Sequence, residues 1–269
     1  TNPLLRKENV ISLRNVLACG TSTEVSVPCM FSMYGRNSYS EKKGKSTENV
    51  LDILRRAGVS ILWRENNSDS KGVALRVQYV DYRKPDRNPV CDVECRDEGM
   101  LEGLQAYIDG RPRGDILIVL HQMGNHGPAY YKRYPEAFER FKPSCRTNQL
   151  DECSTEAIGN AYDNAILYTD YFLSRTIALL KRNDRRFETA LIYISDHGES
   201  LGEKGIFLHG LPYVIAPDEQ KRVAAILWLG DDFEEEKKTL RKRLDGRYSH
   251  ENLFHTLLGL MEVETTVYD

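Results

Sequence analysis

Short apolar runs along the chain alternate with longer segments in which apolar residues recur every three or four positions. The short runs are rich in β-branched residues and are bounded by Gly, Asp or Pro, which is typical of strands in the interior of a sheet. We predict such strands at Val59–Trp63, Asp115–Leu120, Ala190–Ser195 and Ala224–Leu229. The alternation predicts an α/β fold, with a mainly parallel sheet covered by helices and formed as a single domain over residues 1–269.

Two segments between these strands have the pattern of helices. Residues 48–57 precede the first strand and stop at Gly58, because glycine readily adopts the left-handed conformation that ends a helix. A longer segment carries one amphipathic stripe, which we expect to cover the sheet. Its members are Ile158, Tyr162, Ala165, Ile166, Thr169, Phe172, Leu173, Ile177 and Leu180.

Two polar segments interrupt the pattern. Residues 66–96 contain two prolines and a cysteine pair, and they predict an excursion outside the core that could hold a substrate. Residues 231–247 are densely charged, but Glu234 lies four residues before Lys238. We therefore interpret this second segment as a solvated helix rather than as a binding patch.

Composition and charge narrow the function classes. The 269 residues are 41% hydrophobic, which is enough for a core, and 37 basic against 40 acidic residues give a net charge of −3. Without a basic surplus, nucleic acid is excluded as the main partner. The longest apolar run, Val223–Leu229, is far shorter than a membrane span. The start at Thr1 lacks Met and a signal-like segment, so we expect a mature fragment or excised domain.

The six cysteines form three close pairs along the sequence, and none has zinc-knuckle spacing. Closing short loops costs the least chain entropy, which favours disulfides between neighbours and an oxidising compartment. Buried reduced thiols remain the alternative. The favoured pairs are Cys19–Cys29, Cys91–Cys95 and Cys145–Cys153.

Metal-binding side chains follow the strand at 190–195, where Asp196 and His197 precede a glycine. Ligands of open α/β sheets collect beyond the carboxyl ends of strands, and a carboxylate with an imidazole suits zinc or another divalent ion. The alternative is a capping Asp before a tight turn, with a surface His.

Four of the six histidines are predicted to gather in loops that follow two strands. His121 and His126 come after the strand at 115–120, and His209 lies twelve positions after His197, in a loop that could fold back over a metal. The coincidence favours function over isolated structural imidazoles. His250 and His255 fall on a C-terminal apolar helical stripe, and we assign both to structure.

A hydroxyl-rich stretch between Cys19 and Cys29 leads into a predicted helix. A hydroxyl at a helix N-terminus is well placed to carry a phosphoryl group, because free N–H groups and the helix dipole stabilise the added oxygens. Thr23 would become a nucleophile beside a metal that lowers its pKa. The alternative is an ordinary helix cap.

Five motifs together resemble the lipid A phosphoethanolamine transferases of the colistin-resistance type. They are Cys-Gly-Thr-Ser-Thr at 19–23, Ser-Val-Pro-Cys-Met-Phe at 26–31, Asn-Asn-Ser-Asp-Ser-Lys-Gly at 66–72, His-Gln-Met-Gly-Asn-His-Gly-Pro-Ala-Tyr at 121–130 and Ser-Asp-His-Gly-Glu-Ser-Leu-Gly-Glu at 195–203. The resemblance implies a sulfatase or alkaline-phosphatase-like fold. It also implies the periplasmic domain of an inner-membrane protein whose N-terminal transmembrane part lies outside this chain.

The resemblance also implies roles for individual residues. Thr23 matches the nucleophile, and Thr23, Asp196 and His197 match the ligands of one or two zinc ions. His126 and His209 match residues that contact a second metal or the substrate. Asn67 and Lys71 match contacts to the phosphoethanolamine headgroup, and we expect Glu199 and His121 to support the ligands. The three cysteine pairs correspond to disulfides of the family.

One departure from the family pattern concerns the metal. The family carries a further zinc ligand, a Glu in a Gly-Glu-Thr motif on its first core strand, shortly before the Thr-Asn-Pro-Leu-Leu with which this chain begins. Glu8 and Glu24 are nearby acids, but neither lies in such a motif. With fewer ligands, zinc binding by this chain is expected to be weaker.

The expected reaction is transfer of phosphoethanolamine from phosphatidylethanolamine to a lipid A phosphate through a phosphoethanolamine-threonine, giving polymyxin and colistin resistance. We expect a monomer acting at the periplasmic face of the inner membrane. The first rival is a phosphatase or sulfatase, although Ser26-Val27-Pro28-Cys29-Met30 lacks the Arg of a formylglycine motif. The second is a catalytically silent metal- or glycan-binding domain.

Overall fold

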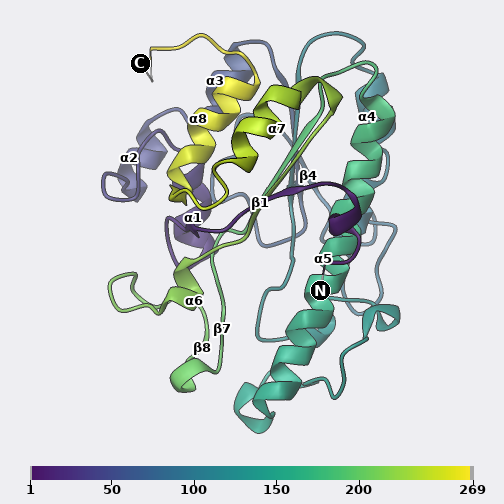
Figure 1. Ribbon diagram of the computed structural model, residues 1–269, viewed down its shortest axis with the longest axis vertical. Helices are drawn as coiled ribbons and strands as arrows, with labels where there is room; N and C mark the ends of the chain where they lie inside the picture. The colour runs from purple at the N-terminus through teal and green to yellow at the C-terminus, as the bar shows by residue number, and fades with distance from the viewer. Residues whose placement is uncertain (1, 267–269) are drawn as a thin grey trace.

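The computed structural model describes residues 2–266 and contains two three-stranded sheets between layers of helices (Figure 1). In the first sheet all neighbours are parallel, and in the second both pairs are antiparallel. The order in the first is β4 (Gln78–Asp81), β3 (Ser60–Glu65), β5 (Ile116–His121), and in the second β1 (Ile11–Leu13), β9 (Ala225–Leu229), β6 (Ala190–Ile194). Two short ladders pair β2 (Val16–Leu17) with β10 (Tyr248–Ser249) and β7 (Ser200–Leu201) with β8 (Phe207–Leu208).

Helices cover both faces of these sheets. The α-helices are α1 (Thr23–Met30), α2 (Glu41–Ser46), α3 (Val50–Arg56), α4 (Leu104–Asp109), α5 (Thr155–Asn183), α6 (Asp218–Lys221), α7 (Glu234–Arg241) and α8 (Glu251–Leu260). Short 3-10 helices lie at Leu5–Lys7, Asp97–Leu101, Tyr130–Lys132, Glu136–Phe138, Leu150–Glu152, Glu203–Gly205 and Asp231–Phe233. One apolar cluster joins α1, α3 and α8 to β3, β5 and β6, and a second joins α5 to β6 and β9.

The predicted α/β fold is confirmed, and the four predicted strands correspond to β3, β5, β6 and β9. The last of these is antiparallel to both of its neighbours, so the sheet is only partly parallel. The prediction for residues 66–96 is wrong in part, because β4 lies within this range and pairs in parallel with β3. The sequence of β4 does not reveal this pairing, because β4 is an edge strand and its residues are exposed or only partly buried.

The predicted helices form where their patterns place them. The side chain of Asn49 caps α3, and Gly58 follows that helix with φ +99°. Ser154 caps the 29-residue α5, whose buried residues include Ile158, Phe172 and Ile177. No helix among the described residues has the length and apolar composition needed to span a membrane.

The charged segment at 231–247 is mostly helical and exposed, as predicted, because α7 buries none of its residues. The predicted pairing of Glu234 with Lys238 is wrong. Glu234 contacts Lys237 at 2.7 Å, and Lys238 contacts Glu235 at the same distance, both three residues apart. The three predicted disulfides are present.

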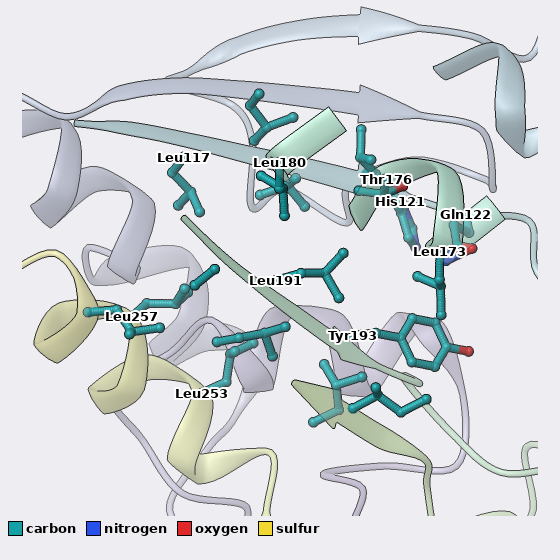
Figure 2. A pocket seen from close by; sticks show the side chains of 18 of the residues that line it. Leu117, His121, Gln122, Leu173, Thr176, Leu180, Leu191, Tyr193, Leu253 and Leu257 are labelled. Atoms are coloured by element: carbon teal, nitrogen blue, oxygen red, sulfur yellow. The ribbon is translucent and has the colours of Figure 1, made fainter. Parts of the chain in front are cut away.

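An apolar groove of about 1400 Å³ separates the two sheets between β5 and β6 (Figure 2). Within residues 2–266, β5 pairs only with β3 and β6 only with β9, so each strand presents one unpaired edge to the groove. Leu117 and Leu191 line it together with Leu253 and Leu257 of α8. The groove ends at the carboxyl ends of both strands, where the candidate site lies.

Candidate active site

The first component of the site is the N-terminus of α1, which begins at Thr23. Ser22 precedes it in an extended conformation, and its carbonyl accepts the N–H groups of Val25 and Ser26. The Cys19–Cys29 disulfide ties the approach to this helix to its far end. Thr23 is therefore held with its hydroxyl where the free N–H groups and positive dipole end favour negative charge.

The second component follows β6. His197 lies with its Nε2 3.7 Å from Oδ2 of Asp196, while its Nδ1 is 2.9 Å from the carbonyl of Gly198. Donation from Nδ1 to that carbonyl leaves Nε2 with the lone pair that a metal requires. Gly198 is needed for this turn, because a Cβ there would lie 1.9 Å from the carbonyl oxygen of Glu219.

Thr23 and Asp196 come together across the site. Burial alone would raise the pKa of Asp196, but His197 and the neighbouring Thr23 hydroxyl lower it instead. Oδ2 of Asp196 is buried and makes no well-formed hydrogen bond among residues 2–266. An uncompensated carboxylate oxygen beside an imidazole and a hydroxyl is the donor set that a divalent cation fits.

Three histidines from separate loops meet next to this pair. The ring centroid of His209 lies 3.9 Å from that of His197 and 5.2 Å from that of His126. Glu199 holds His209 through a 3.0 Å contact to Nδ1. Ligand atoms of His197, Glu199 and His209 all lie within 4.8 Å of one another, so these three side chains form a group that could hold a metal ion.

The environments of His126 and His209 differ. Burial lowers the pKa of His126, whereas for His209 the effect of burial is outweighed by the Glu199 carboxylate, which raises its pKa. The surroundings therefore shift the pKa values of the two imidazoles in opposite directions.

The fourth predicted histidine, His121, lies at the end of β5 and outside this cluster. Its Nδ1 contacts Oε2 of Glu65 at 2.8 Å, and Glu65 is fully buried. The same carboxylate accepts from Nε1 of Trp63 at 2.9 Å and from the N–H of Asn67 at 2.7 Å. Glu65 thus fixes the ring of His121 and the backbone of Asn67 together.

Asn67 and Lys71 contact two different elements of the site. The Asn67 amide donates to the carbonyl of Gln122, in the loop after β5. Nζ of Lys71 lies 3.1 Å from Glu24, one residue after Thr23 in α1. Glu24 is therefore an exposed partner of Lys71, and Glu8 pairs with Lys181, so neither acid is placed with Asp196 and His197.

Several positioning contacts were not anticipated from the sequence. Asp97 accepts the N–H groups of Met123 and Gly124, and Nε of Arg133 donates to the carbonyl of His126 at 2.6 Å. Both contacts hold the loop that carries His126. The position of Glu65, a charged residue at the end of a buried strand, could have indicated its role. Asp97 and Arg133 lie at the ends of short 3-10 helices, where no motif marks them.

His250 confirms its structural assignment. It is fully buried, accepts the N–H of Cys19 at Nδ1 and lies 2.9 Å from the carbonyl of Ser195 at Nε2. One imidazole therefore links the segment before Thr23 to the residue before Asp196. His250 is the residue before α8, whereas His255 lies within that helix and packs its ring against Phe254.

Comparisons with known proteins identify related sequences and structures. A sequence model of the sulfatase family matches residues 1–263. Phosphoethanolamine transferase EptA of Escherichia coli K12 is 47% identical over the whole chain, which spans 50% of that relative's length. The soluble domain of lipooligosaccharide phosphoethanolamine transferase A from Neisseria meningitidis is 38% identical, with TM-score 0.94 over 100% of this chain and 82% of that one.

A second solved structure is equally informative. It is the C-terminal periplasmic domain of phosphoethanolamine transferase EptC from Campylobacter jejuni, with 42% identity and TM-score 0.89, and the match covers 100% of this chain and 83% of that one. Both structures extend the similarity across every element that contributes to the site.

Proposed function

Because the chain belongs to the phosphoethanolamine transferases of the sulfatase family, we propose that it transfers phosphoethanolamine from phosphatidylethanolamine to a phosphate of lipid A. The observation that carries this proposal is the Thr23 hydroxyl at the start of α1, next to the Asp196 carboxylate and His197. A nucleophile, an anion-stabilising helix end and a metal-binding pair converge there.

The reaction consists of two displacements at phosphorus. The Thr23 oxygen attacks the phosphorus of phosphatidylethanolamine, the bond to diacylglycerol breaks, and the departing oxygen takes up a proton. A phosphate oxygen of lipid A then attacks the phosphothreonine, which restores the Thr23 hydroxyl. The N-terminus of α1 stabilises the negative charge that develops on the phosphoryl oxygens in both steps.

Asp196, His197 and Thr23 would hold a zinc ion, and Glu199 with His209 would hold a second. Bound zinc supplies a lowered hydroxyl pKa and charge stabilisation. His126 and His209 border His197 on the open side of the cluster. We assign to His126 the transfer of protons to the leaving oxygen and from the acceptor, because His209 would be a ligand of the second ion.

Asn67 and Lys71 complete the proposal as headgroup contacts. Lys71 is mostly buried and reaches the acids around α1, so it would meet the phosphate of the donor near Thr23. The backbone of Lys71 has φ +50°, an uncommon value for a residue with a side chain. Such a conformation is typical of positions where a precise side-chain placement is maintained.

We place this reaction at the periplasmic face of the inner membrane. Three disulfides fit an oxidising compartment, and the related EptC domain is periplasmic. The ethanolamine cation would reduce the negative charge of lipid A, so that cationic polymyxins bind it less well.

Intact-mass and peptide mass spectrometry test the proposal. The zinc-loaded protein is incubated with phosphatidylethanolamine, with and without lipid A. We expect a phosphoethanolamine adduct on Thr23 that disappears as modified lipid A forms. Release of free phosphoethanolamine regardless of acceptor would indicate a hydrolase, and absence of any adduct or product would indicate a silent domain. Ser22→Ala serves as the matched control, because its side chain makes no capping hydrogen bond.

A further inference from the structure

The connection between β8 and α6 projects from the body of the molecule (Figure 1). It carries two exposed aliphatic side chains. Val214 is 91% exposed and Ile215 is 68% exposed. Exposing apolar side chains to water to this extent costs free energy unless another apolar surface covers them. They lie next to each other at the tip of one loop, which we call the 211–217 loop.

This loop is held in a defined shape. The carbonyl of Pro212 accepts the N–H groups of both Ile215 and Ala216 at 2.9 Å, which closes a tight turn at the tip. At the base, the N–H of Leu211 donates to the buried side chain of Gln220. The apolar tip is therefore presented by a fixed turn.

The same loop belongs to the rim of the active site. The N–H of Gly210 donates to the carbonyl of Thr21 at 2.8 Å, and the Thr21 hydroxyl donates to the carbonyl of Leu211 at 2.6 Å. Thr21 lies two residues before the proposed nucleophile, and His209 lies two residues before the loop. Whatever covers the tip is thus brought to the entrance that leads to Thr23.

The residue before the tip, Tyr213, has its aromatic ring close to two cationic side chains. The guanidinium of Arg36 lies 3.6 Å from the centroid of the Tyr213 ring, and Nζ of Lys221 lies 5.7 Å from it. An aliphatic tip with an aromatic ring and long basic side chains next to it is typical of segments that enter a membrane interface.

Acidic groups balance the cations near the loop. Asp218 contacts Lys221 and Arg222, and Glu251 accepts the N–H of Arg36. The loop therefore lacks the surplus of positive charge that recruits anionic lipids. Its chemistry fits a zwitterionic bilayer surface, entered by the apolar tip.

We propose that Val214 and Ile215 insert into the bilayer that contains the lipid donor and thereby bring its headgroup to Thr23. The inference rests on the proposed function only in naming that donor, because the insertion itself follows from the exposure, rigidity and position of the loop. It deepens the proposed function by assigning a membrane-facing side to the active site.

Tryptophan placed at the tip tests insertion without requiring catalysis. Val214→Trp is compared with Val93→Trp, a matched control because Val93 is 72% exposed and lies in a different loop. The native tryptophans, Trp63 and Trp228, are buried. With vesicles of phosphatidylethanolamine and phosphatidylcholine, we expect a blue shift of the emission for Val214→Trp only. No shift at 214, or equal shifts at both positions, would overturn the proposal.

A rate comparison separates this inference from the proposed function. Zinc-loaded Val214→Ser/Ile215→Ser is assayed with donor in vesicles and with a short-chain, monomeric phosphatidylethanolamine. With vesicles, we expect the transfer rate to fall by on the order of ten-fold, because two apolar side chains no longer enter the bilayer interface. With the monomeric donor, we expect an unchanged rate. Equal losses with both donors would overturn the inference. If the unsubstituted protein uses neither donor, the proposed function fails, while the tryptophan emission still reports on insertion.

Discussion

The rim of the active site and the groove between β5 and β6 meet at the same edge of the sheets but are built in opposite ways. At the rim, buried hydrogen bonds from Glu65, Asp97 and His250 hold loops that are far apart in sequence. Along the groove, every residue of β5 is only partly buried, whereas all five residues of β9 are buried. Polar contacts therefore position the candidate catalytic side chains, while the apolar core on either side of the groove supplies stability.

Loss of the nucleophile should have the largest effect. Thr23→Ala removes the only oxygen on which the covalent intermediate can form, so transfer should fall by on the order of 10³-fold or more. The rate of lipid A modification measures this, with Ser22→Ala expected to stay within about three-fold of the original protein. Substantial transfer by Thr23→Ala would show that the residues of the rim do not carry out the reaction.

Core truncations compare the groove with the packed layers directly. Leu54→Ala, at a fully buried position in α3, should cost about 2–5 kcal/mol of unfolding free energy. Leu117→Ala, on the groove side of β5, should cost about 1 kcal/mol, because its side chain is only partly covered. Urea unfolding monitored by circular dichroism gives both values. Equal costs would mean that the groove is as tightly packed as the core.

The link through His250 should make stability depend on pH. Burial lowers the pKa of His250 to about 4, from 6.5, so the unfolded chain binds more protons than the folded one between these values. The free energy of unfolding should therefore decrease as pH falls from about 6.5 to about 4, by roughly 3 kcal/mol in total. Unfolding curves at several pH values measure this decrease, and His250→Gln should lose most of it. An unaltered pH dependence in His250→Gln would rule out this imidazole as the cause.

The smallest effect is expected at Glu65, which contacts His121 without reaching the site itself. Glu65→Gln keeps the size of the side chain but removes the charge that orients the ring, so transfer should fall by about 10-fold. His121→Gln in the same background should then add little, which a double-mutant cycle measures. Additive losses would show that Glu65 and His121 act separately.

The sequence predicts the parts of this molecule that local patterns encode. Apolar runs place β3, β5, β6 and β9, and short cysteine spacings place the three disulfides. The motif at 195–200 predicts that Asp196 and His197 follow a strand. Each of these signals is contained within about ten residues of the chain.

Long-range contacts were beyond the reach of such patterns. Glu65 meets His121 across 56 residues, and Asp97 meets Met123 across 26. Nothing in the pattern around 225–229 reveals that β9 is antiparallel, because a buried strand is apolar in either direction. The pairing of β4 is hidden for the opposite reason, since its exposed residues resemble those of a loop.

The position of bound zinc tests the central claim most directly. A crystal structure of the zinc-loaded protein, with anomalous scattering recorded at the zinc edge, locates each ion among the candidate ligands. We predict an ion about 2.0–2.2 Å from the Thr23 hydroxyl, the Asp196 carboxylate and Nε2 of His197. Zinc bound only among Glu199, His209 and His126, with the Thr23 oxygen outside bonding distance, would contradict the account.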